Sequence, residues 1–152
     1  MLPFYLKMMG LNAVHYPVPY TVIAEVSQQT SDEEVMQLLR GSWRPRVMGA
    51  WLSAGREDPL LVKTLLWSLT TSLGSLTAPP LASVAVFATG SGAMAALQEY
   101  LGTDVAHSDG SAGFIGAAIQ HLGGDAGGCE VHDRHRTALD EMMVVVQRLA
   151  EH

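Results

Sequence analysis

Two segments of this sequence share one pattern, and their repetition indicates the fold. Residues 45–55 read PRVMGAWLSAG, and residues 80–90 read PLASVAVFATG. Each segment begins with proline, contains alanine at its centre and ends with glycine, so that equivalent positions lie 35 residues apart. Proline in the first turn and glycine after the last turn are typical of a helix. The sequence therefore predicts helices that recur as structural repeats.

A weaker third copy and several capping signals extend this pattern. Ala118 and Gly123 follow their equivalents in the second copy by 33 residues, although the proline is absent. Ser31 with Glu34 forms a capping box, and Asp58 precedes a proline at a first helical position. Seven helices are therefore predicted, over residues 32–40, 44–54, 59–69, 81–88, 92–101, 109–122 and 132–150, with the fifth ending at Gly102. Small mid-helix residues are expected to let neighbouring helices approach closely, namely Gly49, Ala50, Ala85, Gly116 and Ala117.

Residues 44–123 resemble HEAT-like repeats. The shared features are a proline that opens the first helix of a unit, a mid-helix alanine, and a glycine turn before a second helix rich in Leu and Ala. The resemblance implies an all-α fold of antiparallel helix pairs stacked into a superhelix. The combination of PFYLK (3–7) and WRPRVMGAW (43–51), with residues 109–125 as a later helix, is similar to an uncharacterised family of small actinobacterial proteins. That similarity implies the same fold and no assigned activity, and an ordinary irregular helical bundle is the alternative.

The length of the chain, 152 residues, fits one domain, and its 48% of apolar residues is enough for a core. We expect an irregular N-terminal segment over residues 1–30, helix pairs over 31–123 and a C-terminal helix over 131–151. Within the first segment, a short helix is expected from Pro3 to Met9. Residues 16–20 contain two prolines and are not expected to be helical, whereas residues 21–26 fit either a short strand or a helical turn.

The distribution of charge is uneven along the chain. The net charge is −6, and no Lys or Arg occurs between Thr64 and Asp133. Four acidic residues of this stretch are candidates for partner binding, namely Glu99, Asp104, Asp109 and Asp125. A surface of this sign repels nucleic acid and attracts basic proteins. The sequence therefore predicts a basic protein partner, and plain solubility is the alternative.

Aromatic and basic residues are most concentrated between residues 43 and 51. Trp and Arg are favoured anchors of protein interfaces, so Trp43 and Arg46 are further partner-binding candidates. The structural alternative places Trp51 and Trp67 in the core. It also pairs Arg44 and Arg46 with the acidic residues at positions 32–34.

The best candidate metal ligands are Cys129, His132 and His135. The two histidines are three residues apart and would share one face of a helix. Zinc accepts such ligands, but a structural zinc site needs four, and the chain has a single cysteine. His135 also belongs to the apolar stripe of the last helix, where a hydrogen-bonded core histidine is the simpler interpretation. We therefore expect no cofactor.

Three functions fit the sequence. The first is a non-enzymatic protein-binding module, for example an immunity or antitoxin-type protein that covers a positively charged site. The second is a metal-dependent or thiol-dependent enzyme that uses Cys129, His132 and His135, and the third is a homo-oligomeric structural protein. A lone cysteine suits the cytoplasm. We expect no membrane segment, because no apolar run reaches the ~20 residues that a transmembrane helix needs.

Overall fold

The computed structural model describes residues 4–72, 74–107 and 111–152, and leaves out the side chains of residues 103–107. All regular structure in these ranges is helical, which confirms the predicted all-α class. The helices are α1 (Tyr5–Met8), α2 (Asn12–His15), α3 (Tyr20–Gln28), α4 (Asp32–Leu39), α5 (Trp43–Leu52), α6 (Pro59–Thr71), α7 (Ala78–Thr89), the 3-10 turn η1 (Gly90–Ala93), α8 (Met94–His107), α9 (Ala112–His121) and α10 (Asp133–Glu151).

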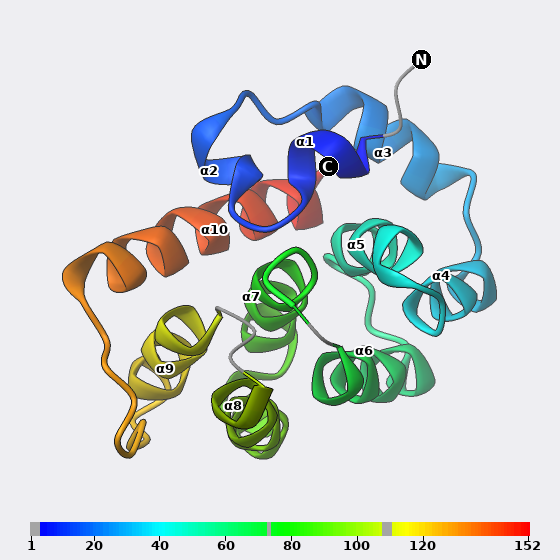
Figure 1. The fold of residues 1–152 in the computed structure, drawn as a ribbon. Coiled ribbons are helices and arrows are strands. Elements are labelled where there is room, and N and C mark those ends of the chain that lie inside the picture. Colours follow the sequence, from blue (N-terminus) through cyan, green and yellow to red (C-terminus); the bar gives the residue numbers. More distant parts are fainter. Residues whose placement is uncertain (1–3, 73, 108–110) are drawn as a thin grey trace.

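The helices form two layers (Figure 1). One layer contains α4, α6 and α8, and the other contains α5, α7 and α9. The closest packing between the layers joins α4 with α5, α6 with α7, and α8 with α9. α10 packs on α7 and α9, on the side of the second layer that faces away from the first layer. The helices α1, α2 and α3 lie on the same side (Figure 1).

The three alanines aligned by the predicted repeat all lie in the second layer. Ala50, Ala85 and Ala118 occupy equivalent places in α5, α7 and α9, and each is 0% exposed. The sequence predicted that each proline-led helix pairs with the helix that follows it. This pairing was wrong, because the proline-led α5 packs on the preceding α4 rather than on α6. The reason is Gly49 in α5, which leaves room for the backbone of α4. A Cβ atom there would lie 3.1 Å from the Leu39 amide nitrogen.

α7 is the central helix of the fold. Residues 78–86 are all buried, and α7 packs on α5, α6, α9 and α10. Together with η1 and the first part of α8, it forms one helical stretch, Ala78–Gly102, that is long and apolar enough to cross a membrane by length and composition. The chain changes direction within this stretch at Gly90, whose φ is +55°. Its burial among other helices fits the core of a soluble protein.

Several helix boundaries differ from the prediction. Gly102 does not adopt the left-handed conformation that ends a helix, and α8 continues through it to His107. The N-terminal segment is less irregular than expected, because it contains α1, α2 and α3. The open choice at residues 21–26 is a helix, α3, because it buries Ile23 against the rest of the fold. α1 is fixed by the Trp51 indole N–H, which donates to the Met8 carbonyl oxygen over 2.9 Å.

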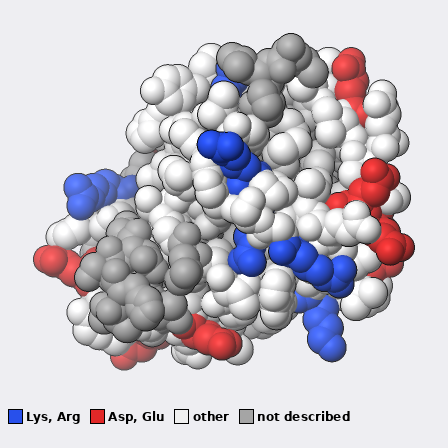
Figure 2. Space-filling view, turned by 45° about the vertical axis from the view of Figure 1, so that its right-hand side comes forward, with Lys and Arg blue, Asp and Glu red and all other residues white. Residues whose placement is uncertain are grey.

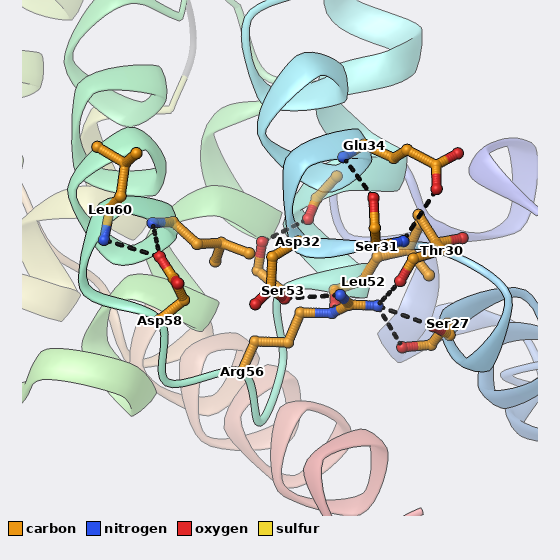
Figure 3. Close-up of polar contacts among 12 residues, drawn as sticks. Ser27, Thr30, Ser31, Asp32, Glu34, Leu52, Ser53, Arg56, Asp58 and Leu60 are labelled. Atoms are coloured by element: carbon orange, nitrogen blue, oxygen red, sulfur yellow. Dashed lines mark hydrogen bonds and ion pairs between the residues drawn. The ribbon is translucent and has the colours of Figure 1, made fainter.

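Arg56 connects three helix ends (Figure 3). Its guanidinium donates to the carbonyl oxygens of Ser27 and Thr30, both over 2.8 Å, and to the Asp32 carboxylate over 2.8 Å. Its Nε donates to the Leu52 carbonyl oxygen over 2.9 Å. The side chain is 15% exposed. These bonds satisfy backbone acceptors at the ends of α3 and α5 that no helical partner can reach.

The Arg56→Ala substitution is expected to lower the free energy of unfolding by about 2–4 kcal/mol, because it removes one charged donor from several part-buried acceptors at once. Arg56→Lys should recover little of this loss, since a single ammonium cannot match the planar fork. Urea unfolding measures the change. Arg40→Ala, at an exposed arginine one helix away, is the matched control. Equal losses at the two positions would contradict this role for Arg56.

Gly49→Ala and Gly102→Ala are expected to change stability in opposite directions. At Gly49 the added Cβ meets the α4 backbone, and we expect a loss of about 1 kcal/mol despite the better helix propensity of alanine. At Gly102 the Cβ meets nothing within 4 Å, and a gain of about 0.5–1 kcal/mol is expected. Thermal unfolding of both variants compares them, and a shift of the same sign in both would refute the close α4–α5 contact.

Candidate functional site

The predicted acidic partner site is only partly described by the structure. Glu99 is exposed on α8, and Asp125 is exposed in the loop after α9. One Asp125 carboxylate oxygen accepts a hydrogen bond from the Gly127 amide over 2.8 Å, which fixes this loop. The side chain of Asp104 and the whole of Asp109 lie outside the described residues.

A groove lies beside Asp125. It has a volume of about 490 Å³ and lies between α8 and the loop over residues 125–129. Its wall contains Gln98, the neighbour of Glu99, and Asp125. Leu101 and Ile119 add apolar surface. The groove therefore combines an acidic edge with an apolar wall.

Arg136 of α10 lies close to residues of the stretch between Thr64 and Asp133, which contains no Lys or Arg. The Arg136 guanidinium lies 2.9 Å from an Asp133 carboxylate oxygen and also donates to the Gln120 side-chain oxygen over 3.2 Å. The face seen in Figure 2 contains both acidic and basic side chains. The stretch without Lys or Arg in the sequence is thus bordered in space by an arginine of the last helix.

Arg46, a predicted partner-binding residue, donates hydrogen bonds to the backbone at two helix ends. It donates to the Gly41 carbonyl oxygen over 2.7 Å and to the Ser68 carbonyl oxygen over 3.1 Å, so that it connects the ends of α4 and α6. Partial burial lowers the pKa of its guanidinium. The predicted pairing of Arg46 with residues 32–34 was wrong, because Arg56 binds Asp32.

The tryptophans divide between core and surface. Trp51 is in the core as expected, but Trp67 is 46% exposed, and the Arg46 guanidinium covers its ring at 5.3 Å. The exposed position of Trp67 corrects the prediction for this residue. Trp43 is half-buried and packs edge-on against the Tyr5 ring, with ring centroids 5.8 Å apart. The Arg44 guanidinium lies 5.1 Å from the centroid of the Trp43 ring. Arg44 therefore contacts an aromatic ring, whereas the sequence predicted that it pairs with the acidic residues at positions 32–34.

The histidine pair caps a helix. The His135 Nδ1 accepts the His132 backbone N–H over 2.9 Å at the first turn of α10. The Cys129 thiol instead donates to the Ala112 carbonyl oxygen at the start of α9, over 3.2 Å. In the part of the chain that the structure describes, no group of three or more His, Cys, Asp or Glu side chains is placed to bind a metal ion.

A larger cleft between α2, α9 and α10 was not predicted from the sequence. It has a volume of about 720 Å³, and apolar side chains form much of its wall. Its lining residues are Leu11, Val14, His15, Ser75, Pro79, Ser111, Phe114, Arg134, His135, Thr137, Ala138 and Glu141. The spacing of apolar residues in the last helix predicted that His135 and Ala138 face the interior. Only the fold shows that a cleft remains between these residues and α2.

His135 lies in an environment that disfavours its charged form. Burial lowers the pKa of the imidazole, and the positive charges of Arg134, His132 and Arg136 lower it further. The ring packs on Gly113 of α9, where only a glycine leaves space for it. His135 is therefore a half-buried residue of the cleft wall in which the neutral form of the imidazole is favoured.

Comparisons of the chain with protein-family models, with curated proteins and with solved structures give no match. The similarity to HEAT-like repeats and to a small actinobacterial family therefore remains a prediction from the sequence. The site has to be interpreted from its own geometry.

Stability is expected to depend on pH through His135. Because the folded state lowers the pKa of this imidazole, the unfolded state binds the proton more readily. The free energy of unfolding should therefore be at its full value above the ordinary histidine pKa, about 6.5, and decrease as the pH falls below it. Urea unfolding at pH 5 to 8 measures this slope. It should become shallower in His135→Gln and remain in His121→Gln, and an unchanged slope in His135→Gln would rule out this origin.

Proposed function

We propose that the protein is a non-enzymatic binding module that recognises a basic segment of a partner protein in the groove beside α8. The observation that supports this proposal is the position of Asp125 in the wall of a groove that also has apolar surface. Glu99 is exposed and follows the wall residue Gln98 in the sequence. Both residues belong to the stretch of sequence that contains no Lys or Arg. The stacked helices would supply the rigid frame on which such a surface is useful.

The chemistry of the groove suits lysine or arginine side chains. These side chains place an aliphatic stem on apolar surface and keep the charged end near an acceptor. Leu101 and Ile119 would contact the stem, and the carboxylates of Glu99 and Asp125 would attract the charge. The net charge of −6 would increase the rate at which a basic partner is encountered.

A concrete form of this proposal is an immunity or antitoxin-type protein that covers the positively charged site of a toxin. The small size and the acidic net charge support it. The single cysteine suits a cytoplasmic location for such a complex.

The alternatives have less support from the geometry. An enzyme that uses Cys129 with His132 and His135 would need the thiol near the imidazoles, whereas the thiol donates to the α9 backbone and His135 caps α10. A homo-oligomer would need a continuous apolar surface. Exposed apolar side chains occur on several helices, for example Leu60, Trp67, Phe87 and Val144, and a measurement of solution mass tests this alternative.

Replacement of the two acidic residues is expected to weaken binding to a basic partner. The test uses basic proteins encoded by neighbouring genes, with affinity measured by calorimetry at low and high salt. The variant Glu99→Gln/Asp125→Asn should lose about tenfold or more in affinity, because it removes charge-assisted contacts. The affinity of the unmodified protein should fall as salt increases.

The matched control is Glu25→Gln/Glu33→Gln, which removes the same charge from exposed positions on α3 and α4. It should bind almost as well as the unmodified protein. A complex that forms equally well with both double variants, or that is insensitive to salt, would contradict the proposed groove.

A further inference from the structure

The cleft between α2, α9 and α10 is separate from the groove proposed above, and the two share no lining residue. At about 720 Å³ it falls within the usual size of pockets for small organic ligands. Leu11, Val14 and Phe114 give it apolar walls, and Arg134 and Glu141 of α10 lie on its rim. Within the described residues, the side chains of Arg134 and Glu141 form no hydrogen bond or ion pair.

The orientation of the proton on His135 is determined by its helix cap. Since Nδ1 accepts the His132 amide, the neutral ring must have its proton on Nε2. No described residue accepts a hydrogen bond from this Nε2–H. His135, which lines the cleft, therefore carries one N–H donor of fixed tautomer.

A second donor lies beside it. Arg134 precedes His135 in the first turn of α10 and lines the same cleft. The N-terminal end of a 19-residue helix adds a partial positive charge to this end of the cleft. Glu141 lies seven residues further along α10, about 10 Å away along the helix axis.

We propose that the cleft binds a small carboxylic acid with an apolar body. The carboxylate would accept hydrogen bonds from the Arg134 guanidinium and from the His135 Nε2–H. The apolar body would lie on Leu11, Val14 and Phe114. This ligand site is independent of the protein-binding groove.

The test measures binding of four probes by calorimetry and ligand-detected NMR. The acids are 2-naphthoate and octanoate, and their uncharged counterparts are 2-naphthylmethanol and octanol. At least one acid should bind with a dissociation constant below about 1 mM, and about tenfold more tightly than its alcohol, as a charge-assisted contact requires.

Two variants and one control locate the site. Arg134→Gln should remove the preference for the acid but keep the weak binding of the alcohol. Ala138→Trp should fill the cleft and abolish both. Arg148→Gln, near the other end of α10, removes the same charge and should leave binding unchanged.

Three results would overturn the proposal. They are that neither acid binds, that acid and alcohol bind with equal affinity, and that Arg134→Gln keeps the preference for the acid over the alcohol. The circular dichroism spectrum of each variant establishes that it is folded. Because none of these substitutions changes Glu99 or Asp125, failure here leaves the binding of a basic partner unaffected, and the two proposals are tested separately.

Discussion

The structure depends on the burial of α7 on all sides. Its residues 78–86 are enclosed by α5, α6, α9 and α10, and none of them is charged. Alanine at positions 82 and 85 keeps the helix narrow, so that four neighbours can pack around it. A helix that is apolar on every face is stable only in such surroundings.

The sequence was most informative where local chemistry decides structure. Capping residues such as Ser31 and Asp58, and the glycine at 90, marked helix ends correctly, because their effect depends only on nearby backbone. Gly55 has a positive φ but lies three residues beyond the last residue of α5. The assignment of helices to repeat units could not be predicted, since it depends on which helix approaches Gly49 in space. Gly102 was misassigned because a helix that is supported by neighbouring helices tolerates glycine.

The role of long polar side chains was also outside what the sequence could predict. Arg46 and Arg56 donate to backbone carbonyl oxygens of distant helices, and such acceptors have no signal in the sequence. The spacing of His132 and His135 correctly predicted that they are neighbours, but a cap rather than a metal explains their contact. The large cleft was missed because its walls come from four separated parts of the chain.

Native-state hydrogen exchange of the backbone amides tests the central position of α7 most directly. If α7 is enclosed as described, the amides of residues 82–86 should exchange only on global unfolding, with the highest protection in the protein, while those of α1 and α2 exchange through local opening. Protection of α7 no greater than that of α1 would contradict the account, because the helix could then separate from its neighbours without disruption of the fold.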